Sequence, residues 1–156
     1  MPGLMVRLLT AATLAGGLAF PVGAATTELI VVDPHTGLAI SGYDPVAYFT
    51  DNAPRPGKGE IEYTFAGAVW RFRNEGNRAA FLDDSDIYMP RFGGYDPLGV
   101  ARGAALPGDP RLWLISGERL YLFFTPENKA AFAADPEQIA TDAERKWPTV
   151  QLTLAP

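Results

Sequence analysis

Arg91-Phe-Gly-Gly-Tyr-Asp-Pro-Leu-Gly-Val-Ala-Arg-Gly103 contains at its centre the tetrapeptide Gly-Tyr-Asp-Pro, which the chain also carries at Gly42–Pro45. Each copy precedes a hairpin-like stretch and then a helix-like stretch. The helix-like stretches also match, because Phe72–Phe81 aligns with Phe123–Phe132 at a distance of 51 residues. This pattern predicts two pseudo-repeated units, at about residues 42–90 and 94–140.

Each unit is expected to form a β-hairpin followed by a helix, so the predicted fold class is α+β. The segment Glu62–Arg73 alternates aromatic and polar residues around Ala66-Gly67, which is typical of a hairpin with one apolar face. The second hairpin, Leu112–Phe124, has nearly continuous apolar runs and should be covered on both faces. A two-stranded hairpin is too small to bury such a face alone, so the two units should pack around one core. The core candidates of the first hairpin are Tyr63, Phe65, Trp70 and Phe72.

The ends of the helices and the flanking segments give further expectations. Asn74 and Thr125 are predicted N-caps, because each stands just before a helix-like stretch. At the amino-terminal side, Glu28–Val32 and Leu38–Ile40 are expected to form a small hairpin around the turn Asp33–Gly37. At the carboxyl-terminal side, a last helix at Pro136–Lys146 is expected before a strand-like segment at Thr149–Leu154.

The first 24 residues have the pattern of a secretory signal peptide. Arg7 precedes an apolar stretch at Leu8–Phe20, and small residues follow up to Ala24. Cleavage is expected after Ala24 or Ala25, which leaves residues 25–156 as a single domain with a periplasmic or secreted location. The alternative is a retained membrane anchor, although Pro21 makes this segment a weak membrane span.

Charge and cysteine content exclude several classes of function. The chain has 13 basic and 18 acidic residues, for a net charge of −5. An acidic chain is a poor partner for nucleic acids or anionic lipid surfaces, and we expect no stable membrane insertion after signal cleavage. The chain has no cysteine, so it has neither disulfides nor thiolate ligands or nucleophiles. His35, the only histidine, is expected to be an exposed turn residue, and Asp83–Asp86 to be a solvated helix end.

Five stretches of the chain together form a recognisable pattern: Ser41–Phe49, Val69–Phe72, Asn77–Phe81, Tyr88–Tyr95 and Ala143–Pro148. They resemble the small exported bacterial members of the YHS-domain proteins. The resemblance covers roughly Leu38 to Pro148 and implies an α+β fold of short hairpins and helices, with a role in metal binding. Members of this family commonly have Cys directly after Gly-Gly-Tyr, where this chain has Asp96, so a soft thiolate donor is replaced by a hard carboxylate.

Three functions follow as hypotheses. The first is a non-catalytic binding module, whose ligand lies between the two Gly-Tyr-Asp-Pro segments; a divalent metal ion held by Asp44 and Asp96 is one version of it. The second is an enzyme that uses Asp44 and Asp96 as an acid/base pair. The third is a structural or protein-interaction module, in which each Asp caps the helical turn begun by the following Pro and each Tyr packs in the core. The candidate ligand-binding residues are Tyr43, Asp44, Tyr48, Arg91, Tyr95 and Asp96.

Overall fold

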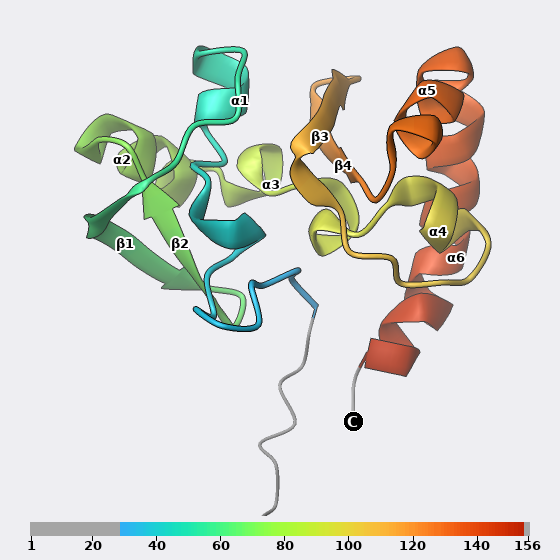
Figure 1. The fold of residues 1–156 in the computed structure, drawn as a ribbon, viewed down its shortest axis with the longest axis horizontal. Coiled ribbons are helices and arrows are strands. Elements are labelled where there is room, and N and C mark those ends of the chain that lie inside the picture. The colour runs from blue at the N-terminus through green and yellow to red at the C-terminus, as the bar shows by residue number, and fades with distance from the viewer. Residues whose placement is uncertain (1–28, 155–156) are drawn as a thin grey trace, which may run out of the picture.

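The computed structural model describes residues 29–154, so the expected signal peptide lies outside the described residues. The fold is α+β, as predicted, with two antiparallel two-stranded sheets and short helices around them (Figure 1). The first half contains α1 Ala47–Thr50, β1 Lys58–Phe65, β2 Ala68–Phe72, α2 Glu75–Asp83 and α3 Ser85–Tyr88. The second half contains α4 Pro97–Ala101, β3 Asp109–Ser116, β4 Arg119–Phe123, α5 Pro126–Ala134 and α6 Pro136–Leu154. A short 3-10 helix precedes each of α1 and α4, at Ile40–Gly42 (η1) and Arg91–Gly94 (η2).

The hairpins of the two halves have the same dimensions. In each hairpin the first strand (β1 or β3) has 8 residues, the second strand (β2 or β4) has 5, and the following helix (α2 or α5) has 9. Strand pairing is interrupted in both hairpins, between Lys58 and Glu62 and between Asp109 and Trp113. Both tips place two successive residues at positive φ, a backbone twist that suits a two-residue hairpin turn.

The two helices begin at the predicted caps. The Asn74 side chain accepts a hydrogen bond from the N–H of Asn77 at 2.8 Å, and the Thr125 hydroxyl accepts one from the N–H of Asn128 at 3.1 Å. Each cap satisfies a backbone donor that the first turn of a helix leaves without an intrahelical partner.

The buried side chains form two clusters, one in each half, and β4 contributes to both. The N-terminal cluster includes Trp70, Phe72, Phe81 and also Leu120 and Leu122 of β4. The C-terminal cluster contains the alternate residues of β4, together with Phe92, Tyr95, Leu98, Val100, Phe132, Ala143 and Val150. Successive side chains of a strand point to opposite faces, so Tyr121 and Phe123 pack on the opposite side from Leu120 and Leu122. The prediction that the second hairpin is covered on both faces is therefore confirmed for β4, in which four successive residues are buried. The expected common core thus has two parts with β4 between them.

One expectation at the ends of the domain was wrong, and another was confirmed only in part. The segment Thr149–Leu154 is not a strand but the last part of α6, which continues through Pro148. The helix continues because Val150 is buried and Leu154 packs against the C-terminal cluster, which outweighs the missing N–H of the proline. The expected amino-terminal hairpin is reduced to one antiparallel bridge between Val32 and Ala39.

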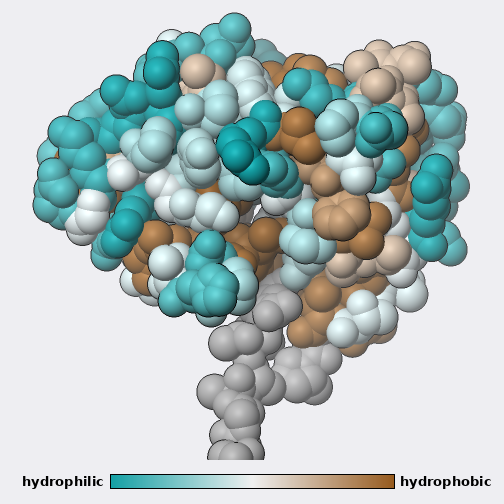
Figure 2. Space-filling view, in the orientation of Figure 1, coloured by the Kyte–Doolittle hydropathy of each residue, from teal (hydrophilic) through white to brown (hydrophobic). Residues whose placement is uncertain are grey.

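The outer surface is mostly hydrophilic over the first half, and more apolar atoms are visible from the centre toward the second half (Figure 2). His35 is exposed at its turn, and Asp83, Asp84 and Asp86 are exposed where α2 ends and α3 begins, as predicted. Within residues 29–154, no helix combines the length and apolar character needed to cross a membrane.

Candidate functional site

Asp44 is fully buried and connects three segments of the first half. Its Oδ1 accepts the N–H of Val46 at 2.9 Å, which caps the turn that leads into α1. Its Oδ2 accepts the backbone N–H of Arg73, just after β2, at 2.8 Å, and the side-chain amide of Asn77 in α2 at 2.7 Å. The carboxylate therefore holds the start of α1, the end of β2 and the start of α2 together.

Asp96 occupies the equivalent place in the second half and is also fully buried. Its Oδ1 accepts the N–H groups of Leu98 and Gly99 at 2.8 and 3.2 Å, at the start of α4. Its Oδ2 accepts the N–H of Phe124, just after β4, at 2.7 Å, and the side-chain amide of Asn128 in α5 at 2.9 Å. A carboxylate has about four lone-pair sites, so Asp96 has no acceptor capacity left.

The surroundings of these carboxylates do not fit a bound cation. An ion at Asp44 or Asp96 would have to displace N–H donors that already neutralise the oxygens, and it would meet donors where it needs ligands. Across the described part of the chain, no group of three or more His, Asp or Glu side chains lies close enough to hold a metal ion. The structure also does not unite the two carboxylates as an acid/base pair, because each one bonds within its own half.

Tyr48 is buried at the boundary between the halves. Its hydroxyl donates a hydrogen bond to the carbonyl of Pro110 at 2.7 Å, and its ring packs edge-on against Trp113 at 5.3 Å. Burial raises the pKa of the Tyr48 hydroxyl well above its ordinary value, and the nearby Tyr43, Asp109 and Asp44 add to the rise. Tyr48 therefore joins the two halves as a neutral donor.

Tyr43 and Tyr95, the tyrosines of the two Gly-Tyr-Asp-Pro segments, line neighbouring hollows. A hollow of about 540 Å³ lies between the halves and is lined by Tyr43 together with the segment 107–111, which leads into and begins β3. A smaller hollow of about 270 Å³ is lined by Tyr95 and Leu154. The structure thus brings the two tyrosines toward a shared region, because both hollows are also lined by Val31, Val32, Pro34 and Pro107.

The hollow beside Tyr43, which we call the interdomain-like hollow, has an aromatic and weakly acidic lining. Phe124 lies at its edge with half of its surface exposed. Asp109 and Arg111 form a two-point ion pair, with Nε–Oδ1 and Nη2–Oδ2 distances of 3.1 and 2.8 Å. The hydrogen bond from the Arg111 side chain holds the pKa of the Asp109 carboxyl below its usual value, so both charges persist at neutral pH.

Arg91 lies away from the interdomain-like hollow. Its guanidinium pairs with Glu144 of α6 at 2.7 Å and stacks over the ring of Phe92 at 5.5 Å. Its Nε is buried and has no hydrogen-bond partner. The ion pair with Glu144 attaches η2 to α6, so the structure does not bring Arg91 together with the other candidate residues.

Two groups of residues in this region were not predicted from the sequence. Asn77 and Asn128 donate to the buried carboxylates, and their identical place in the two matched segments was the available signal. Phe124 and Arg111 line the interdomain-like hollow, but nothing in the sequence places them beside Tyr43, because they lie far from it along the chain.

Comparison of the chain with protein-family models, with curated proteins and with solved structures finds no match.

Proposed function

We propose that this protein is an exported, non-catalytic binding module of the YHS type, and that it binds a small ligand in the interdomain-like hollow. One observation carries the proposal: the hollow of about 540 Å³ has Tyr43 of the first Gly-Tyr-Asp-Pro segment on its wall. That volume lies within the range of ordinary small-molecule sites. The export signal is inferred from residues 1–24, and the family from the sequence resemblance.

The lining favours an uncharged ligand with a flat apolar face. The rings of Tyr43 and Phe124 offer aromatic surface, and the prolines of the two loops give the hollow rigid walls. Asp109 and Arg111 neutralise each other, which leaves only Asp33 as an excess charge. Its carboxylate accepts hydrogen bonds from the N–H groups of its own turn, so it is already engaged.

Asp44 and Asp96 have a different role in this proposal from the one expected for a metal or acid/base site. Their oxygens accept hydrogen bonds from backbone and side-chain amide donors. Both residues therefore fix the backbone segments that carry the lining of the hollow and do not contact the ligand themselves. Asp96 does this directly, because it fixes the backbone of Phe124 at the edge of the hollow.

The test is a screen of uncharged ring-containing small molecules against the full mature chain, read by thermal shift and then by calorimetric titration. We expect a hit whose affinity falls at least tenfold in Phe124→Ala. Tyr43→Phe keeps the ring and should lose affinity only if the ligand bonds the hydroxyl. Leu82→Ala is the matched control, because Leu82 is also about half exposed but lies on α2, away from the hollow. Hits that bind Phe124→Ala and wild type equally would disprove the assignment of the site.

One observation favours the interaction-module alternative. A third hollow, of about 500 Å³, is lined by the apolar side chains of Phe49, Tyr88, Ile115 and the partly exposed Ile87, and also by Glu118 and Arg119. Ile87→Asp should leave small-molecule binding unchanged and abolish capture of a protein partner, if this hollow is the functional surface.

A further inference from the structure

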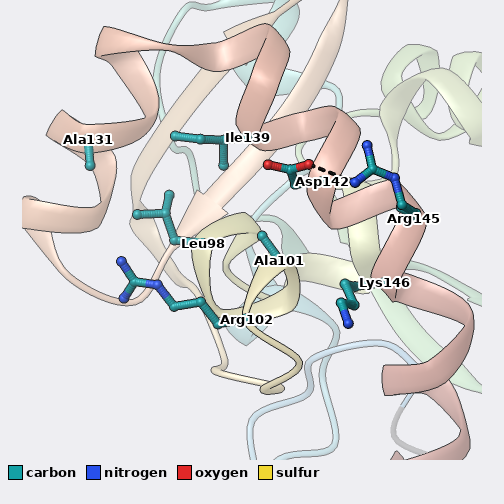
Figure 3. Close-up of a pocket in the computed structure, with 8 residues that line it drawn as sticks. All are labelled: Leu98, Ala101, Arg102, Ala131, Ile139, Asp142, Arg145 and Lys146. Atoms are coloured by element: carbon teal, nitrogen blue, oxygen red, sulfur yellow. Dashed lines mark ion pairs between the residues drawn. The ribbon is translucent and has the colours of Figure 1, made fainter.

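A fourth hollow, of about 430 Å³, lies among α4, α5 and α6 in the second half, away from the interdomain-like hollow (Figure 3). We propose that it binds a small carboxylate with an apolar body, of the size of a medium-chain fatty acid. Its floor is apolar and comes from all three helices: Leu98 and Ala101 of α4, Ala131 of α5 and Ile139 of α6. This proposal is independent of the ligand proposed above.

The charges around this floor are mostly positive. Arg102, Arg145 and Lys146 line the hollow, against the single carboxylate of Asp142. The Asp142 carboxylate is already engaged, because it pairs with Arg145 at 3.1 Å and accepts a hydrogen bond from Gln138 at 3.1 Å. Two cations therefore remain to be neutralised.

Arg102 and Lys146 are the two cations available for a ligand. Both are exposed, and within residues 29–154 neither forms an ion pair. In Figure 3 the Arg102 side chain extends below Leu98, and the Lys146 side chain lies on the far side of Ala101 and points away from Arg102, so both exposed side chains would have to turn to reach one ligand group. An arginine fork can hold a carboxylate by two parallel hydrogen bonds, and the flexible lysine can approach the same group from the other side.

The apolar floor selects the rest of the ligand. Leu98 is almost fully buried, so the apolar surface open to a hydrocarbon chain comes mainly from Ala101, Ala131 and Ile139, which are half-buried or exposed. Burial of methylene groups on this surface adds affinity in proportion to the area removed from water. A small carboxylate without a hydrocarbon chain would contact only the cations, and a neutral hydrocarbon would contact only the apolar floor. Both should bind more weakly than a ligand that has both parts.

The net charge of the molecule limits the ligand to a small monoanion. The chain carries −5 overall, so a polyanion such as a nucleic acid is repelled at long range even though the hollow itself is positive. Salt screens both kinds of ligand beyond about 8 Å, but a monoanion carries a single charge and therefore experiences much less of the remaining repulsion than a polyanion.

The experiment compares octanoate, octanamide and acetate as probes, each titrated against the full mature chain by calorimetry and by amide chemical shifts. Octanoate should bind with a dissociation constant on the order of 1 mM or below, whereas the neutral amide and the short anion should bind at least tenfold more weakly. Absence of octanoate binding at concentrations of about 20 mM, or equal binding of octanoate and octanamide, would overturn the proposal.

A double variant tests the two cations directly. Arg102→Gln with Lys146→Gln should weaken octanoate binding at least tenfold and leave the unfolding midpoint unchanged, because both side chains are exposed and unpaired. Arg55→Gln with Lys58→Gln is the matched control, since it changes the net charge equally but lies in the first half. Equal loss in both double variants would show a general charge effect and overturn the site. Phe124→Ala should leave octanoate binding intact, which separates this site from the interdomain-like hollow.

Discussion

At the scale of single residues, each buried aspartate connects segments of its half that the two-stranded hairpin alone does not hold together. Asp96 receives two N–H groups from the start of α4, one from the residue after β4 and one amide from α5. Hydrogen bonds to a charged acceptor are stronger than those between neutral groups, and they compensate for removing the carboxylate from water.

Removal of this carboxylate is expected to destabilise the ligand-free protein. Asp96→Ala leaves the N–H groups of Leu98 and Phe124 without their acceptor, so we expect a loss of roughly 3 kcal/mol in the free energy of unfolding. Urea denaturation followed by circular dichroism measures it. Asp86→Ala, at an exposed carboxylate in α3, should cost less than about 0.5 kcal/mol. Equal midpoints for the two variants would contradict the structural role of Asp96.

The second prediction at this scale concerns the alkaline stability that Tyr48 confers. The pKa of Tyr48 is raised in the folded protein, so its contribution to stability is complete below the pKa of an unfolded tyrosine, near 10, and is lost as pH rises above that value. Wild type should therefore lose about 1.4 kcal/mol more than Tyr48→Phe for each pH unit above 10.

Urea midpoints of wild type and Tyr48→Phe at pH 8 and pH 11 measure this difference. At pH 8 the variant should be about 1 kcal/mol less stable, because the carbonyl of Pro110 loses its donor. If the urea midpoints of the two proteins change by the same amount between pH 8 and pH 11, Tyr48 ionises as easily in the folded state as in the unfolded state. Tyr63→Phe is the control, since Tyr63 is only partly buried.

At the scale of elements, β4 is the strand on which both clusters depend. Its last four side chains are all buried, in one cluster or the other, so truncation of any of them should be costly, whereas the next residue, Phe124, lies beyond the strand and is half exposed. Phe123→Ala should cost about 3–5 kcal/mol, because it leaves a cavity beside Phe132, whereas Phe124→Ala, at a half-exposed ring, should cost less than about 1 kcal/mol. Urea denaturation of the two variants tests this, and similar midpoints would mean that β4 does not have the register described.

Part of this element structure was predictable from the sequence. Aromatic alternation around Ala66-Gly67 and the caps Asn74 and Thr125 define the hairpins and helices by local rules. The end of α6 was not predictable in this way, because Pro148 indicates a stop and only the packing of Val150 on distant helices overrides it. The conformational preference of a residue for helix, strand or turn is outweighed where tertiary burial favours another conformation.

The same limit applies to the candidate site. That Asp44 and Asp96 could cap a turn followed from the Pro after each, but the second oxygen of each bonds with residues about 30 positions away. The hollows combine segments that meet only after folding, such as Tyr43 with Arg111, or Arg102 with Lys146. A single sequence does not show which residues far apart in the chain become neighbours in the folded protein.

At the scale of the whole molecule, the two halves should unfold as one unit. Each cluster has its own tryptophan, Trp70 in the first and Trp147 against the second, while Trp113 packs at Tyr48 between them. Fluorine-labelled tryptophan therefore gives three reporters without any mutation, and all three resonances should lose their native positions at the same urea concentration. Loss of the Trp147 signal before the Trp70 signal would show that the halves are independent.

The place of Leu120 and Leu122 in the N-terminal cluster has a consequence for the order of events during synthesis. When the ribosome has released the first half of the chain, the apolar face around Trp70 still lacks the two leucines that cover it. The core of the first half is therefore completed only when β4 is available, which fits the export proposed for this chain.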